Sequence, residues 1–158
     1  MIEFPFGEQG RVLLPIYIKP YHDTTMLLLD FKVDTGADFT TISKSDLREL
    51  GYSRSWIDRN IFEDGSATTA SGEYIAIGFI CLPFINILGY EARNWPFRVM
   101  TDESRDFRNL LGRDLLSGFN YTFNNDDDIF QITRAREFKR RFKFLDGQEI
   151  HVIHKSGT

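Results

Sequence analysis

One acidic residue in a tight turn is the strongest candidate for chemistry in this sequence. Asp34 follows the apolar run 26–33, and the chain leads straight back into a β-branched segment at residues 40–42. Gly36 lets the chain turn tightly without steric cost. The pattern predicts a carboxylate presented at the end of a strand. A carboxyl group held in this way can donate or accept a proton during a reaction.

A second informative stretch lies about 75 residues further along the chain and reads Leu-Leu-Gly-Arg-Asp-Leu-Leu over residues 110–116. The two leucines are expected to end a strand. Gly112 permits a close approach of another backbone, and the spacing from Arg113 predicts a short helix that stops at Gly118.

Together these stretches resemble the two signatures of the retropepsin-like aspartic proteases. Asp-Thr-Gly-Ala at residues 34–37 is followed, in the family's order, by a hairpin pattern and by residues 110–116. The resemblance covers roughly residues 11–132 and is closest to bacterial and cellular members. It implies an all-β fold, a closed barrel with a short helix after the second signature, and the hydrolysis of peptide bonds.

The resemblance also implies a homodimer. An aspartic protease needs two carboxylates about 3 Å apart that share one proton, so that one activates a water and the other protonates the scissile carbonyl. This sequence holds a single Asp-Thr-Gly motif. Asp34 of each copy would therefore supply half of an active site that acts on a polypeptide without a cofactor.

The same resemblance assigns supporting roles around Asp34. Thr35 would hydrogen-bond across the two-fold axis, and the backbone of Gly36 would orient the Asp34 carboxyl group. Asp38 would contact the peptide main chain and form a bidentate pair with Arg113, so that loss of either partner leaves a partly buried charge uncompensated. The predicted support residues are Thr35, Gly36, Ala37, Asp38 and Arg113.

The stretch between the two signatures predicts a hairpin. Residues 61–62, 66–69 and 73–77 read as strands, with a first turn candidate at Asp64-Gly65 and a second at Ala70, Ser71 and Gly72. In the resembled family a hairpin here is the flap that closes over the substrate, so these three residues are the predicted substrate-binding tip. The tip lacks the glycine-rich sequence of viral flaps, and an ordinary surface hairpin is the alternative.

The remaining pattern predicts the elements that position these residues. Residues 11–18 and 26–33 read as strands; Pro15 favours an edge or a break in the first, and the second is dense enough in apolar residues to be covered on both faces. Ser43 and Asp46 have the form of a capping box before a helix at about residues 43–50. Residues 52–60 are interpreted as a loop with at most one helical turn. Further strands are expected within residues 77–88, 95–100, 121–123 and 129–132.

Bulk properties favour a folded globular protein. The chain has 158 residues, a formal charge of -4 and 15% aromatic residues, enough to bury a core. Cys81 is the only cysteine, which excludes an intrachain disulfide and a multi-cysteine metal site, and it is interpreted as a buried small hydrophobe. No secretory signal and no uninterrupted membrane-spanning stretch is visible, so a soluble, cytoplasmic protein is expected.

Charge separates the C-terminal residues from the rest. Residues 133–158 carry seven Lys or Arg against three Asp or Glu, whereas residues 1–132 carry 12 against 20. We therefore expect a protease domain at 1–132 and a basic extension at 133–158, in which Asp146-Gly147 predicts a β-hairpin.

For the basic residues of this extension, a solvated face or one docked on the chain's own acidic body is favoured over nucleic-acid binding. His151 and His154 do not predict a metal site, because residues three apart on a strand point to opposite faces.

Two alternatives stay open. The same fold could serve as a catalytically silent binding or dimerisation module, although binding alone does not require an acid in an Asp-Thr-Gly turn. Asp114 could be read as a second acid, but its place in the second signature favours a hydrogen-bonding role at the start of a helix.

Overall fold

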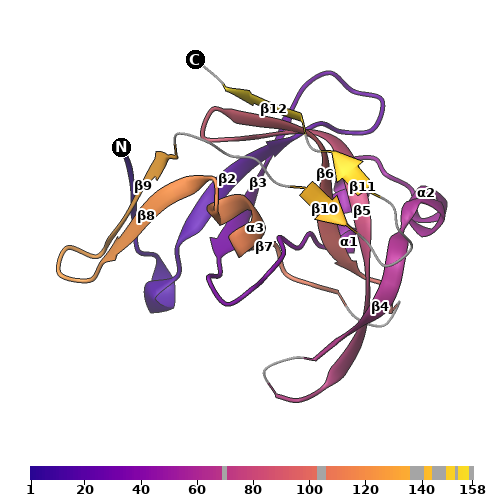
Figure 1. Cartoon of the computed structure of the whole chain (residues 1–158), viewed down its shortest axis with the longest axis horizontal. Coiled ribbons are helices and arrows are strands. Elements are labelled where there is room, and N and C mark those ends of the chain that lie inside the picture. The colour runs from indigo at the N-terminus through magenta and orange to yellow at the C-terminus, as the bar shows by residue number, and fades with distance from the viewer. Residues whose placement is uncertain (69–70, 103–105, 136–140, 144–148, 152, 157–158) are drawn as a thin grey trace.

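Figure 1 shows the computed structural model of the chain, which is mostly β with short helices. It describes the backbone of residues 1–68, 71–102, 106–135, 141–143, 149–151 and 153–156. Side chains are described for the same residues up to 135, except 63–67. No helix in this described part is long and apolar enough to cross a membrane.

A seven-stranded sheet forms the centre of the fold. Its strands are β2 (Leu13–Ile18), β3 (Leu27–Val33), β4 (Phe62–Thr68), β5 (Tyr74–Ile87), β6 (Tyr90–Met100), β7 (Leu110–Leu111) and β12 (Ile153–Ser156). The pairing order is β12-β6-β5-β2-β3-β7, with β4 beside β5. Every pair is antiparallel except β3 with β7, which run parallel through Lys32–Leu110 and Val33–Leu111. That parallel pair brings the two sequence signatures side by side.

The closed barrel expected from the sequence is not found among the described strands. The pairing order ends at β7 on one side and at β12 on the other. Thr41 forms two isolated β-bridges. One is antiparallel, to Leu110 of β7, and the other is parallel, to Arg98 of β6. The backbones of Thr40 and Ile42 also hydrogen-bond to Arg98, but the segment is short, because the turn after Asp34 precedes it and a helix cap follows at Ser43.

Of two predicted strand properties, the one at Pro15 is met in part and the other is wrong. β2 is an interior strand that pairs with both β3 and β5. Its pairing with β5 begins only at Ile16, so Pro15 lies just outside that ladder and its missing N–H is tolerated there. β3 is not covered on both faces: Phe31 and Val33 are buried, whereas Leu28 is 50% exposed.

Two helices follow the Asp34 turn. α1 (Lys44–Glu49) begins as the capping pattern predicts, because the Ser43 hydroxyl accepts a hydrogen bond from the Asp46 N–H at 3.0 Å. α2 (Arg54–Asn60) replaces the predicted loop and is capped in the same way by Ser53. The mixed polarity of this segment concealed the helix, since Ile57 is its only fully buried residue.

A smaller sheet packs against the same core. It consists of β1 (Ile2–Pro5), β9 (Ile129–Arg134) and β8 (Phe119–Asn124), in that order. β8 and β9 confirm the strands predicted on either side of the polar turn, whereas β1 was not predicted. Phe130 and Ile132 of β9 belong to the core together with β2 and β6 residues. A short 3₁₀ turn (Glu8–Gly10) connects β1 to the strand β2.

Part of the C-terminal extension belongs to the central sheet. β12 pairs with β6 from Ile153 opposite Arg93 to Ser156 opposite Tyr90. β10 (Arg141–Lys143) pairs antiparallel with β11 (Glu149–His151). The predicted turn at Asp146-Gly147 and the side chains of both tail histidines lie outside the described residues. The domain boundary after residue 132 therefore stays a prediction.

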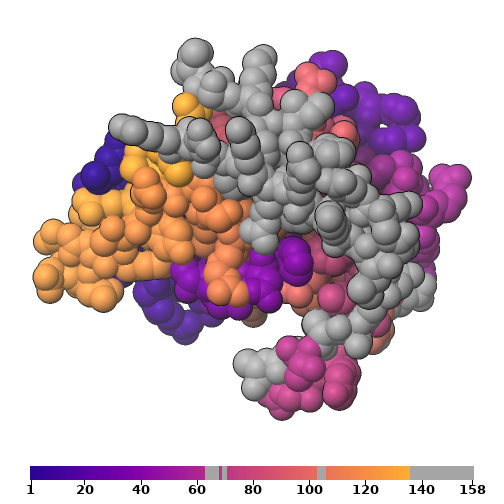
Figure 2. Space-filling model, viewed as in Figure 1, coloured from indigo at the N-terminus to yellow at the C-terminus, as the bar shows by residue number. Residues whose placement is uncertain are grey.

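The hairpin of β4 and the first half of β5 stands out from the body of the molecule (Figures 1 and 2). At its base, Ile75 and Ile77 form a small buried cluster with Met100 at the end of β6, and Phe107 packs against it. Packing of this cluster therefore connects the hairpin to the rest of the molecule.

Candidate active site

The turn after β3 holds the Asp34 carboxyl group by backbone hydrogen bonds. The Gly36 N–H donates to Oδ1 of Asp34 at 3.0 Å. The Asp34 N–H donates to the Leu111 carbonyl at 3.0 Å, and the Ala37 N–H closes the turn on the Asp34 carbonyl at 3.2 Å. Asp34 is half-buried, whereas Thr35 and Gly36 are exposed. The turn thus presents one oriented carboxyl group at the surface.

Residues of the second signature support this turn through backbone hydrogen bonds. The helix α3 (Arg113–Leu116), predicted after Gly112, begins against the loop: the Arg113 N–H donates to the Ala37 carbonyl at 2.8 Å and the Asp114 N–H to the Asp38 carbonyl at 3.2 Å. A Cβ at Gly112 would lie 2.5 Å from the carbonyl carbon of Phe39. The close backbone approach predicted at Gly112 is confirmed, since no side chain fits there.

Asp38 and Arg113 form an ion pair across the two signatures. It joins one nitrogen to one oxygen, Nη2 to Oδ1, and the two side chains are 65% and 59% exposed. The pair is therefore neither the bidentate nor the partly buried one that the sequence analysis expects. Exposed ion pairs contribute at most about 1 kcal/mol, so the pair adds little to the stability of the fold.

Asp114 is a buried structural carboxylate. It has no exposed surface, and its Oδ1 accepts hydrogen bonds from the Thr40 N–H at 3.0 Å, the Thr40 hydroxyl at 2.6 Å and the Leu115 N–H at 2.7 Å. The Thr40 hydroxyl in turn accepts from the Gly112 N–H at 3.1 Å. Asp114 therefore ties α3 to the residues that follow the Asp34 turn, and it is not positioned as a second catalytic acid.

The hairpin meets the active-site loop at its base. The ring of Phe79 in β5 lies edge-on to the ring of Phe39, with 5.0 Å between their centres, and Phe62 of β4 lies 6.1 Å from Phe79. Gly72 turns the chain at the tip with a φ of +82°, beside Ser71. Ala70, the third predicted tip residue, lies outside the described residues.

Sequence reasoning missed two residues of this network, Thr40 and Arg98. Thr40 carries a weak signal, since it is a polar residue that enters an otherwise apolar, β-branched segment. Arg98 carries none, because its main contact, Phe39, is far away in the sequence and Phe107 lies beyond the end of β6, where the sequence does not show that the chain turns back.

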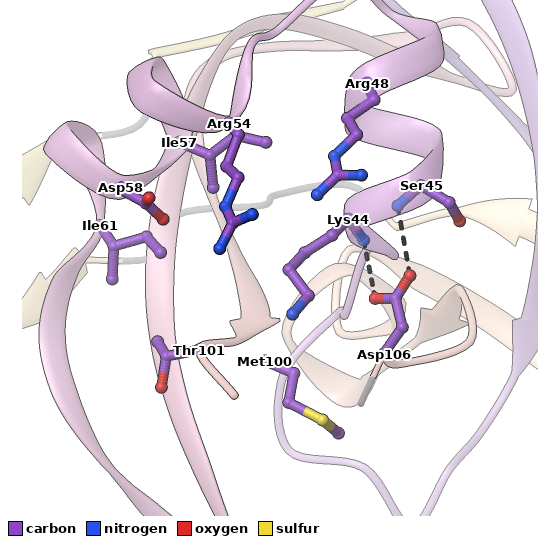
Figure 3. A pocket seen from close by; sticks show the side chains of 10 residues that line it. All are labelled: Lys44, Ser45, Arg48, Arg54, Ile57, Asp58, Ile61, Met100, Thr101 and Asp106. Atoms are coloured by element: carbon purple, nitrogen blue, oxygen red, sulfur yellow. Dashed lines mark hydrogen bonds between the residues drawn. The ribbon is translucent and has the colours of Figure 1, made fainter. Parts of the chain in front are cut away.

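A basic pocket elsewhere does not belong to this site. It has a volume of about 330 Å³ and lies between α1, α2 and the end of β6, where Lys44, Arg48 and Arg54 project into it (Figure 3). Asp106 lines it and accepts hydrogen bonds from the backbone at the start of α1. No residue of the Asp34 turn lines the pocket. Among the described side chains, no group of three or more His, Cys, Asp or Glu could hold a metal ion.

Comparisons with known proteins agree with this geometry. Residues 28–118, more than half of the chain, match the family model of the gag-polyprotein putative aspartyl protease. The fold is similar to that of a retropepsin-like aspartic protease from Rickettsia conorii, with a TM-score of 0.57 and 22% sequence identity over 84% of this chain and 97% of that one. No curated protein matches the sequence significantly. The matched region contains both signatures, α1, α2 and the hairpin.

Proposed function

We propose that this chain, which belongs to the retropepsin-like family of aspartic proteases, hydrolyses peptide bonds of polypeptides as a homodimer. The observation that carries the proposal is the Asp34 turn. Its carboxyl group is held by the Gly36 N–H, and the exposed residues Thr35 and Gly36 surround it. A binding surface has no need of an acid oriented in this way.

The second carboxylate is best supplied by another copy of the chain. An aspartic dyad needs two carboxyl groups about 3 Å apart. Asp38 is engaged by Arg113, and Asp114 is buried with three hydrogen bonds on one oxygen. Neither of these acids is therefore available to Asp34. A two-fold contact would bring two Asp34 turns together, because such a contact joins the same patch of both copies.

The reaction follows from this pairing. The ionised Asp34 accepts a proton from a water that attacks the scissile carbonyl carbon, and the protonated Asp34 of the other copy donates its proton to the carbonyl oxygen. The resulting diol collapses and the C–N bond breaks: the first Asp34 gives the proton it accepted from water to the leaving amine, and the other Asp34 takes a proton back from a diol hydroxyl as the carboxylic acid product forms. One proton must stay on the pair, so activity is expected to be highest at mildly acidic pH.

Neighbouring residues would complete the site. The exposed Thr35 would hydrogen-bond across the two-fold axis, and Gly36 with Ala37 would line the substrate channel beside the Asp38–Arg113 pair. The tip residues 70–72 would close over the substrate. The contact of Phe79 with Phe39 supports this role, because movement of the hairpin would be transmitted to the active-site loop.

Substitution of Asp34 tests the proposal. Purified protein should cleave a fluorescently labelled unfolded polypeptide, and Asp34→Asn should reduce the rate at least about a hundredfold, since it removes the acid and base of the reaction. Asp30→Asn is the matched control, because Asp30 is an exposed acid on the same strand. Cleavage by the Asp34→Asn variant at the wild-type rate would contradict the proposal. A dimer that cleaves nothing would favour a catalytically silent module instead.

A further inference from the structure

Arg98 of β6 lies directly behind the active-site loop. Its N–H donates to the Thr40 carbonyl at 2.9 Å, and its carbonyl accepts from the Ile42 N–H at 3.0 Å. Its guanidinium carbon lies 5.6 Å from the centre of the Phe39 ring and 5.9 Å from that of Phe107. Both distances are within the range of cation–π contact. The guanidinium group is therefore held between a ring of the loop and a ring of the segment that leads to β7.

The guanidinium group is a half-buried charge that interacts electrostatically with two acids. Burial lowers the pKa of Arg98, whereas the carboxylates of Asp38 and Asp114 act in the opposite direction. Its Nε is buried and has no hydrogen-bond partner among the described residues. At Nε the charge is therefore stabilised by the nearby aromatic rings and carboxylates and not by a hydrogen bond.

The two acids hold the loop on either side of Phe39. Asp38 precedes Phe39 and pairs with Arg113, whereas Asp114 accepts two hydrogen bonds from Thr40, which follows it. Removing the charge of Arg98 would leave Asp114 buried with less compensation and would leave Phe39 without its stacked partner. Both effects would act on the segment 38–40, directly after the Asp34 turn.

We infer that Arg98 is a positioning residue of the active site, which fixes the segment 38–40 by balancing Asp38 and Asp114 and by stacking on Phe39. The inference rests on the proposed function, because the turn that Arg98 positions is the one that carries Asp34. Arg98 acts through the loop and not on the substrate. Its removal should therefore lower kcat more than it changes KM.

Two variants separate charge from packing. Arg98→Met keeps a long apolar stem without the charge, and Arg98→Lys keeps the charge without the planar face. The matched control is Arg93→Met, since Arg93 is exposed on the same strand. The measurements are the urea midpoint of unfolding between about pH 4 and 8, and kcat and KM for an unfolded polypeptide.

Arg98→Met should lower the urea midpoint at pH 7, and the difference from the wild type should shrink in acid. The reason is that the attraction between Arg98 and the carboxylates exists only while these are ionised, so the stability it adds is lost as pH falls. Arg113, the other cation at Asp38, stays in place in every variant. In the folded variant kcat should fall at least about tenfold while KM changes less than about threefold. Arg98→Lys should recover part of both losses, and Arg93→Met should behave as the wild type.

A loss of stability that is equal at every pH and equal in the Met and Lys variants would overturn the inference, because it would indicate packing alone. An unchanged kcat in folded Arg98→Met, while Asp34→Asn abolishes cleavage, would also overturn it and would leave the proposed function standing. If the wild type cleaves nothing, the proposed function fails, and the pH-dependent stability difference alone then decides whether Arg98 balances the two acids.

Discussion

At the scale of single residues, Asp34 is positioned by the backbone and not by neighbouring charges. The hydrogen bonds that fix it come from Gly36 and Leu111, and the nearest described acids of the two signatures are engaged elsewhere. Backbone N–H and carbonyl groups do not change charge with pH, whereas a charged side-chain partner would. The arrangement leaves the carboxyl group free to share a proton with a second acid.

Cys81 gives a prediction at the same scale. It is partly buried in β5, less completely than the sequence suggests, and burial raises the pKa of its thiol to about 11. Labelling by iodoacetamide at pH 7 should be at least about tenfold slower than for a free cysteine, because the thiolate fraction falls more than the nucleophilicity rises. Mass spectrometry at a series of pH values measures the rate, which should keep rising beyond pH 9. A plateau near about pH 8.5, the value of an unperturbed thiol, would contradict the assignment.

At the scale of secondary-structure elements, the site exists because β3 and β7 pair in parallel. This pairing places the start of α3 against the Asp34 turn, and Gly112 is the position where the two backbones come closest. The Asp34 turn is therefore supported by backbone packing between two segments that are distant in the sequence.

Substitution of Gly112 tests this support. Gly112→Ala should destabilise the fold by roughly 1–3 kcal/mol, since the added methyl group meets the rigid backbone of Phe39 and Thr40. Urea unfolding measures the loss, and cleavage should fall with it. Gly72→Ala is the matched control: nothing lies within 4 Å of a Cβ there, so only its positive φ is strained. An equal or smaller loss for Gly112→Ala would show that the close approach is not essential.

The elements could be predicted from the sequence where a local signal exists. The Ser43 cap, the glycine of the second signature and the strands around residues 124–128 were recognisable because turn and cap residues act within a few positions. α2, β1 and the contacts of Arg98 could not be predicted in this way. Their stability comes from packing against segments that are distant in sequence, and tertiary contacts override local propensity.

At the scale of the whole molecule, we propose that one chain holds half of an active site. The chain has a single Asp-Thr-Gly motif, and the residues that follow Asp34 in this turn are exposed. Asp114, the acid of the second signature, is buried. An isolated chain should therefore be inactive, and activity should depend on how two copies combine.

Mixing wild-type chain with excess Asp34→Asn chain shows whether two copies share one active site. If dyads form between two copies, random exchange pairs most wild-type chains with inactive partners, so cleavage per wild-type chain should fall to about a tenth at a ratio of one to nine. The measurement is the initial cleavage rate after the two proteins have been allowed to exchange subunits. Activity per wild-type chain that stays constant as Asp34→Asn chain is added would contradict the account, because it would mean that one chain carries a complete active site.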